Sequence, residues 1–207
     1  GALALPLLTA ARATYPEITL QLTEEISGSL IEQLKSGRLN LAVLFDDGQL
    51  GGFETMPLVD EDLMYICRAD SSTRPQGSSI TLGAALGSTL ILPAQQHGVR
   101  PLIEQAAASA GLALTKLIEI NSIAILKSAL LADMGATLLP LAPLRTEIES
   151  GLLAATPIEN PPIRRSVTLC ASRNIPLTNA AAAIRSLVRQ VTATLCANGG
   201  WPGACLR

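Results

Sequence analysis

The sequence predicts an α/β protein with two lobes, and three observations lead to this prediction. The chain has 207 residues, of which 48% are hydrophobic and 15% are charged, so it can bury a large core. Strand-like and helix-like segments alternate along it, which is typical of crossover units built on parallel sheets. This alternation occurs twice, once before residue 80 and once after residue 88. Two α/β lobes are therefore more natural than one wide sheet.

The first lobe opens with residues 18–23, whose alternating apolar and polar side chains predict a half-buried strand. Ser27 precedes an apolar stripe with helical spacing that stops at Gly37, which predicts an N-capped helix. The nearly continuous apolar run 39–45 predicts a strand buried on both faces, as in a parallel sheet.

Two further strands are expected in this lobe, at 53–59 and 63–68. The acidic residues Asp60-Glu61-Asp62 lie between them and predict a solvated hairpin turn. A polar linker rich in Ser, Pro and Gly is expected over 69–79.

The second lobe repeats the alternation. Its expected strands lie at 89–92, 116–120, 136–139, 152–156 and 165–172. Its expected helices lie at 99–110, 122–135 and 141–150. A closing helix, capped by Thr178, carries a buried stripe formed by Ile184, Leu187, Val188 and Val191, and it could return to either lobe. The tail from Asn198 onward is expected to fray.

Charge and aromatic content limit the function classes. Fifteen basic and seventeen acidic residues leave a net charge of −2, so this chain lacks the cationic surface that grips nucleic-acid phosphates. One Trp, two Tyr and two Phe offer few platforms for stacking bases. Charge, Pro or Gly interrupts the apolar stretches before about 18 residues, so no membrane-spanning helix is expected. The start shows no secretory signal and resembles the interior of a longer protein.

The four cysteines do not predict a metal site. Cys67 and Cys170 lie in apolar runs and are interpreted as buried thiols. Cys196 and Cys205 flank a Gly- and Pro-rich tail. The sequence leaves open whether these two cysteines form a disulfide. Without a C-x-x-C pair, and with His97 as the one histidine, the ligands for zinc are too few. We expect no metal, no cofactor and a reducing cytoplasm.

Polar residues at expected helix starts are the candidates for ligand binding. Ser27-Gly28-Ser29 and Asn121-Ser122 each follow a strand and open a helix, where free N–H groups and the helix dipole attract anions. Pro93, Gln95, His97 and Arg100 follow another strand with more polar groups. Plain N-capping and an ordinary loop histidine are the alternatives.

Catalytic motifs are missing by contrast. The sequence holds no G-x-S-x-G elbow and no phosphate loop ending in G-K-[ST], and the single histidine has no evident nucleophile partner. We therefore do not expect an enzyme.

Several segments resemble LysR-type transcriptional regulators. They are Tyr15 to Leu20, Glu24 to Leu30, Leu34 to Phe45 in the form L-x-x-G-x-L-N-L-A-V-L-F, Pro57 to Leu63, Ile120-Asn121-Ser122, and Gly135 to Pro140. The resemblance covers almost the whole chain, and the order and spacing of the motifs are more specific than any one of them. The H-G-V-R core between Leu92 and Arg100 resembles the nitrogen assimilation control branch of that family.

The resemblance implies a fold similar to type II periplasmic binding proteins, with two Rossmann-like subdomains and an effector cleft between them. Subdomain I would comprise 1–91 plus 172–207, and subdomain II 92–171. The family's effector-contact positions map onto Ser27, Ser29, Pro93, Gln95, His97, Arg100, Asn121 and Ser122. The family's N-terminal winged helix-turn-helix is absent from this chain.

The expected function is that of an effector-sensing and oligomerising domain of a LysR-type DNA-binding transcriptional regulator. A small polar or anionic metabolite would bind between the lobes and shift their conformational equilibrium. The chain would self-associate as a dimer or tetramer, and would reach promoter DNA and RNA polymerase only through the full-length protein. A free-standing solute-binding protein of a transporter and a small α/β enzyme are the alternatives.

Overall fold

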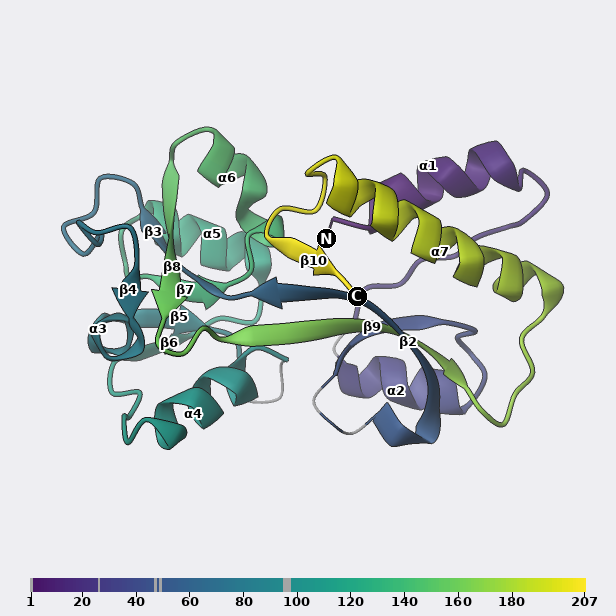
Figure 1. Ribbon diagram of the computed structural model, residues 1–207, viewed down its shortest axis with the longest axis horizontal. Helices are drawn as coiled ribbons and strands as arrows, with labels where there is room; N and C mark the ends of the chain where they lie inside the picture. Colours follow the sequence, from purple (N-terminus) through teal and green to yellow (C-terminus); the bar gives the residue numbers. More distant parts are fainter. Residues whose placement is uncertain (1, 26, 47, 49, 95–97) are drawn as a thin grey trace. The chain divides into compact units, whose positions relative to one another are not determined.

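The computed structural model describes residues 2–25, 27–46, 48, 50–94 and 98–207. The chain forms two compact units, each with its own sheet (Figure 1). Unit 1 comprises Gly1–Glu61 and Ser166–Arg207, and unit 2 comprises Asp62–Arg165.

These bounds differ from the expected subdomain limits at 91/92 and 171/172. The difference arises because the segment after residue 62 pairs with strands of unit 2. In particular, β3 (Met64–Arg68) lies antiparallel between β7 (Thr137–Leu139) and β8 (Leu153–Glu159). The chain therefore passes from one unit to the other within long strands rather than in the polar linker at 69–79.

The sheet of unit 1 has the strand order β1-β9-β2-β10. Its strands are β1 (Ala42–Asp46), β2 (Phe53–Asp62), β9 (Arg164–Ser172) and β10 (Ala204–Leu206). β1 pairs antiparallel with β9, with Ala42 opposite Cys170, and β10 pairs antiparallel with β2, with Cys205 opposite Asp60. The last residue of β2 and the first two of β9 belong to unit 2, so these two strands connect the units.

Helices cover the sheet of unit 1. α7 (Asn179–Ala197) buries a stripe at intervals of three and four residues: Ala181, Ile184, Leu187, Val188, Val191, Thr192 and Leu195. Thr178 caps it by accepting the N–H of Ala181 at 3.1 Å, as predicted. α1 (Ala4–Thr14) packs against α7, and α2 (Ser27–Lys35) inserts Leu34 into a separate cluster with Leu44 and Phe53. A short 3₁₀ turn, Leu50–Gly52, precedes β2.

Unit 2 contains a four-stranded sheet, β4-β8-β3-β7, and a parallel pair, β5-β6. The remaining strands are β4 (Ile80–Thr81), β5 (Leu90–Leu92) and β6 (Leu117–Glu119). Its helices are α3 (Leu82–Gly87), α4 (Arg100–Ser109), α5 (Ile123–Leu131), a 3₁₀ turn Ala142–Leu144 and α6 (Arg145–Glu149). A parallel bridge between Leu90 and Ala136 joins the pair to the residue that precedes β7.

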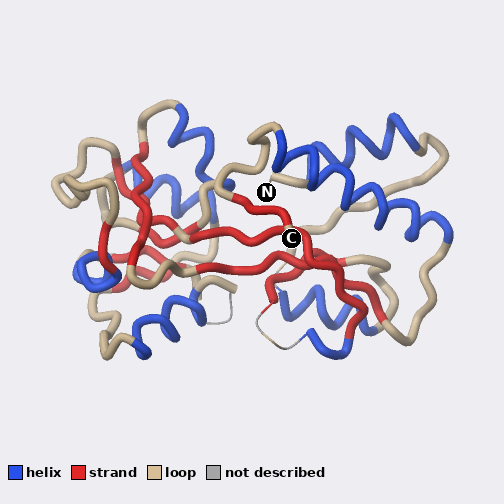
Figure 2. The backbone as a smooth tube through the Cα atoms, in the orientation of Figure 1, coloured by secondary structure: helices blue, strands red, loops and turns tan. Residues whose placement is uncertain are grey.

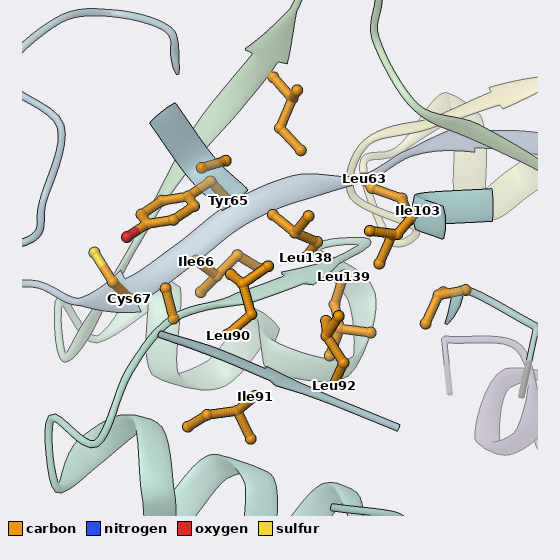
Figure 3. Packing of buried hydrophobic residues seen from close by; sticks show 14 of the residues in the cluster. Leu63, Tyr65, Ile66, Cys67, Leu90, Ile91, Leu92, Ile103, Leu138 and Leu139 are labelled. Atoms are coloured by element: carbon orange, nitrogen blue, oxygen red, sulfur yellow. The ribbon is translucent and has the colours of Figure 1, made fainter. Parts of the chain in front are cut away.

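The core of unit 2 forms around β5. Leu90, Ile91 and Leu92 are all buried, and Figure 3 shows Leu90 and Leu92 pointing toward Leu138 and Leu139, with Ile91 on the opposite side. A strand that is covered on both faces has an uninterrupted run of apolar residues in its sequence. This explains why the sequence analysis predicted β5 correctly. Burying one such side chain contributes roughly 1.5–3 kcal/mol.

Four expectations for unit 1 are wrong. Residues 18–23 form no strand and run as a largely exposed loop (Figure 2), since no strand in the described chain pairs with them. β1 is antiparallel to its neighbour, and Val43 is 37% exposed, so this strand is not buried on both faces. Asp60-Glu61-Asp62 lies within β2 rather than in a turn, because β10 extends the ladder there. The tail does not fray, because it forms β10.

The structure also adds two helices that the sequence analysis did not predict, α1 and α3. Among the described residues, no helix combines the length and the apolar character needed to cross a membrane.

Candidate functional site

The first candidate position, in unit 1, is the start of α2. The helix begins at Ser27 itself, so Ser27 lies in its first turn rather than before it. The Ser29 hydroxyl donates a hydrogen bond to Glu25 Oε2, and the Gln33 side-chain amide donates to the same oxygen at 2.8 Å and to Ser29 Oγ at 3.2 Å. These three side chains form a closed local network on one side of the helix start.

The network gives this helix start a negative group of its own. Hydrogen bonds from Ser29 and then Gln33 lower the pKa of the Glu25 carboxyl below its ordinary value of 4.5. An ionised carboxylate beside the first turn interacts favourably with the helix dipole. The Ser29 hydroxyl is thus hydrogen-bonded to Glu25.

The second candidate position, in unit 2, is the edge where the parallel strands β5 and β6 end together. Leu92 and Glu119 are register partners, and the Ile120 N–H donates to the Leu92 carbonyl at 3.0 Å. One step further, the Ala94 N–H donates to Asn121 Oδ1 at 2.8 Å. Ligands of open α/β sheets bind beyond the carboxyl ends of such strands. The structure therefore brings Pro93 and Asn121 together, as the interpretation of a shared site requires.

Ser122 has a defined structural role at this edge. It is the N-cap of α5, and its Oγ accepts the Ile125 N–H at 3.4 Å, which confirms the predicted cap. The other free N–H groups of the first turn still give this helix start a partial positive charge.

Arg100, a predicted effector contact, is largely buried. It is the first residue of α4 and is only 6% exposed, and its Nε forms an ion pair with Glu104 Oε1 at 2.7 Å. Its Nη1 is buried and has no hydrogen-bond partner within the described residues. Two other predicted contacts, Gln95 and His97, lie outside the described residues.

Three residues that contact predicted site residues were not named as candidates by the sequence analysis: Glu25, Gln33 and Glu104. The available signal was spacing, since Glu25, Ser29 and Gln33 follow one another at intervals of four, as do Arg100 and Glu104. Side chains at this spacing meet on a helix face.

Two hollows lie elsewhere. A groove of about 670 Å³ runs along α7 and is lined by Met56, Ala182, Arg185, Ser186, Arg189, Gln190 and Ala193. A smaller pocket of about 160 Å³ lies in unit 2. Its lining consists of the hydroxyl residues Ser71, Ser72, Thr73, Ser88 and Thr89, together with Asp133, Met134 and Gly135. Of the predicted site residues that the structure describes, none lines either hollow.

Comparison with known proteins defines the class of this chain. Residues 1–193 match the model of the LysR substrate binding domain, so the chain belongs to that family. Among its relatives is the nitrogen assimilation regulatory protein nac of Klebsiella aerogenes, 29% identical over 188 residues. That match covers 91% of this chain and 60% of the relative. The nac protein of Escherichia coli K12 is 31% identical over 140 residues, or 68% of this chain and 45% of the relative. The chain thus spans about half the length of these regulators.

Solved structures show the same fold. The effector binding domain of QuiR, in complex with shikimate, matches with a TM-score of 0.80 at 19% identity, covering 94% of this chain and 92% of that one. The reduced form of OxyR from N. meningitidis matches with a TM-score of 0.77 at 23% identity, covering 100% and 93%. The Synechocystis PCC6803 CcmR regulatory domain, in complex with 2-PG, matches with a TM-score of 0.78 at 18% identity, covering 90% and 89%.

These matches establish the two-lobed fold of LysR effector-binding domains, similar to type II periplasmic binding proteins. They confirm the predicted family and fold class, and the nac matches agree with the predicted branch. The curated relatives are transcriptional regulators rather than enzymes, as expected. The chain is an effector-binding regulatory domain of a LysR-type regulator.

Proposed function

We propose that this domain senses a small polar or anionic metabolite and transmits its binding to the DNA-binding part of a full-length, cytoplasmic regulator. The metabolite would be held at the ends of β5 and β6 in unit 2, and Ser27 at the helix start of α2 in unit 1 is a separate proposed contact. Binding to one conformation better than to another would shift the equilibrium of the oligomer on its promoter.

The observation that carries the proposal is the link between Ala94 and Asn121. This 2.8 Å hydrogen bond ties the exits of two parallel strands into one polar edge. Pro93, Asn121 and Ser122 lie at that edge, and the first turn of α5 adds backbone N–H groups. Donors of this kind favour carboxylates and other oxyanions. Shikimate, the ligand of the QuiR structure, is a hydroxylated carboxylate, which is the same ligand chemistry.

Arg100 takes a specific role in the proposal. Because its guanidinium is buried and paired with Glu104, it would stabilise the first turn of α4 and need not meet the metabolite directly. Ser29 would likewise position the helix start through Glu25, whereas Ser27 would contact the ligand. Gln95 and His97 remain proposed contacts on sequence grounds.

A ligand screen tests the proposal. The purified chain is heated with shikimate, sulfate, phosphate, citrate and the amino acids, and the unfolding temperature is recorded for each. A ligand present at 100 times its dissociation constant stabilises the native state by about 2.7 kcal/mol, which shifts that temperature by several degrees. A hit must then lose affinity in Asn121→Ala and keep it in Ser128→Ala, an exposed change on α5. Equal affinity of both variants for a confirmed ligand would contradict the proposed site.

Self-association is the second part of the proposal. Two helices carry exposed apolar side chains: α1 has Leu5 and Leu8, 73% and 38% exposed, and α5 has Ile125 and Leu131, 60% and 37% exposed. Exposed apolar residues grouped on one helix mark surfaces that a partner covers. We propose that a second copy of the chain covers them, as a dimer or a tetramer.

A further inference from the structure

The last residues of the chain form an element beyond residues 1–193, which match the family model. The match ends at residue 193, within α7, and residues 198–207 turn back after this helix and add β10 to the sheet of unit 1 (Figure 1). We call residues 198–207 the C-terminal segment. Its sequence, Asn198-Gly-Gly-Trp-Pro-Gly-Ala-Cys-Leu-Arg207, contains the one tryptophan of the chain.

The reversal after α7 depends on glycine. Gly199 and Gly203 have φ of +71°, a left-handed conformation that other residues rarely adopt. A Cβ on Gly200 would lie 2.7 Å from Leu195 Cδ2 and 2.8 Å from Asn198 Oδ1. The Gly200 N–H donates to Asn198 Oδ1 at 2.9 Å, which closes the turn. The segment is therefore shaped to return to the sheet.

Trp201 anchors the segment at its start. Its indole is buried, at 7% exposure, and Nε1 donates to Glu61 Oε1 at 2.7 Å. Glu61 is itself only 2% exposed. A buried carboxylate is costly unless it is hydrogen-bonded, so the pairing of Trp201 with Glu61 stabilises the docked segment and gives it one register.

Arg207 anchors the segment at its end. Its backbone N–H donates to the Leu58 carbonyl at 3.1 Å. Its guanidinium contacts Asp60 Oδ2 at 3.5 Å and donates to Ser166 Oγ at 3.2 Å. Ser166 Oγ in turn donates to Asp60 Oδ1 at 2.5 Å. The end of the segment thus contacts both β2 and β9.

These contacts fall where the two connecting strands leave unit 1. β10 pairs with Val59, Asp60 and Glu61, the last three residues of unit 1 before the chain enters unit 2. Ser166 is the first residue of unit 1 on the return strand. The segment therefore holds both strands at their boundary positions.

We propose that the C-terminal segment is a latch on the two connecting strands. When it is docked, it keeps residues 59–61 and 166 in a four-stranded ladder and limits their bending. When it is released, β2 becomes an edge strand and both connections become more flexible. An effector acts by selecting among conformations of the domain. The fraction of molecules with a docked latch therefore sets how strongly effector binding is transmitted to the DNA-binding part. This last step rests on the proposed function.

Hydrogen exchange tests the latch by comparing the full 207-residue chain with two variants. One variant lacks residues 198–207. The other is Trp201→Phe, which keeps an aromatic ring but removes the N–H donor. Cys205→Ser is the control, because Cys205 is exposed. We expect amide exchange at 58–61 and 166–168 to increase at least tenfold in the deletion and several-fold in Trp201→Phe. The control should match the wild type, and protection of α7 and β5 should persist in every variant.

Small-angle X-ray scattering of the deletion and of the control supplies the second readout. A latch predicts a larger spread of radii of gyration after deletion. Two results would overturn the proposal: unchanged exchange at 58–61, or a loss of protection spread equally over α7 and β1, which would make the segment an ordinary part of the fold. Unchanged scattering would overturn the link to the connecting strands. Neither readout uses an effector, so a failed ligand screen does not affect them.

Discussion

Asn121 Oδ1 accepts a 2.8 Å hydrogen bond from the backbone N–H of Ala94, which lies 27 residues earlier in the chain. This contact explains why an asparagine suits the position. The Oδ1 atom accepts the N–H of Ala94, two residues after β5. The Nδ2 amide has no partner within the described part of the chain, and we propose it as the donor for a ligand. The structural role of Asn121 and its proposed binding role can therefore be separated by substitution.

Asn121→Ala should lower the free energy of unfolding by about 1 kcal/mol, because it leaves the Ala94 N–H without its acceptor. Asn121→Asp retains an acceptor oxygen at the same place and should cost less. Urea unfolding of both variants, with Ser128→Ala as the matched change on the same helix, measures the difference. An aspartate variant as unstable as the alanine variant would show that the hydrogen bond does not carry the effect.

Ser29→Ala should raise the pKa of Glu25 toward its ordinary value of 4.5, because Ser29 is the strongest of the hydrogen-bond donors that lower it. A lowered native pKa adds stability above the unfolded value, and this stability is lost as pH falls through the native pKa. The free energy of unfolding of Ser29→Ala should therefore change less with pH below about 4.5 than that of the wild type. NMR titration of the Glu25 carboxyl measures the pKa directly, and Ser27→Ala is the control, since among the described residues the side-chain donors to Glu25 are Ser29 and Gln33. An unchanged Glu25 titration would contradict the network.

Leu5→Glu and Ile125→Glu should each weaken self-association, because a charge on an exposed apolar surface must be desolvated when a partner covers it. Leu152→Glu is the matched control, since Leu152 is also exposed, at 53%, but lies in the loop before β8. Sedimentation equilibrium over a range of protein concentrations measures the effect. A wild-type chain that stays strictly monomeric at high concentration would refute the association itself.

The isolated chain should bind duplex DNA no better than a neutral protein does. Its net charge is −2, and in its adjacent basic pair, Arg164-Arg165, the first member is held by Asp62 at 2.7 Å. Few phosphates can therefore be neutralised. Fluorescence anisotropy with a labelled duplex at 50 and 200 mM salt checks this. Tight binding that weakens steeply with salt would contradict it.

Local patterns predicted most of unit 2 because its strands are short, apolar and bounded by Pro or Gly, as at Leu90–Leu92 before Pro93. Unit 1 was harder, since its features depend on partners distant in sequence. The local sequence around Glu61 predicts a polar turn. In the structure Glu61 is buried and accepts a hydrogen bond from Trp201, which lies 140 residues later in the chain. The alternating residues 18–23 have strand periodicity, but periodicity alone cannot supply a neighbouring strand.

The site shows the same division. The cap at Ser122 followed from local sequence, since one hydroxyl and the third N–H of its own helix suffice. The link from Asn121 to Ala94 required knowing that β5 and β6 are parallel neighbours. The burial of Arg100 did not follow from its local sequence, since charged side chains are rarely buried unless paired, and here Glu104 supplies the ion pair.

Cys170 provides a test of core packing through pH. It is fully buried on β9 opposite Ala42, and burial raises the pKa of its thiol from 9.0 to about 11. A raised native pKa means that the folded state holds the proton more tightly than the unfolded state does. The stability from this difference is complete below pH 9 and is lost as pH rises toward 11. Each pKa unit corresponds to about 1.4 kcal/mol, so the full loss approaches roughly 3 kcal/mol.

Cys170→Ala should therefore flatten the fall of the unfolding free energy between pH 9 and 11, while lowering stability at pH 7 by about 1 kcal/mol through the lost sulfur contacts. Cys205→Ser, an exposed thiol, should leave the slope of the wild type in place. Guanidinium unfolding at five pH values supplies the slopes. Iodoacetamide labelling at pH 8.5 adds an independent readout, in which Cys205 reacts first and Cys170 reacts only after unfolding. Equal slopes for wild type and Cys170→Ala, or early labelling of Cys170, would show that water reaches this part of the β1–β9 pair.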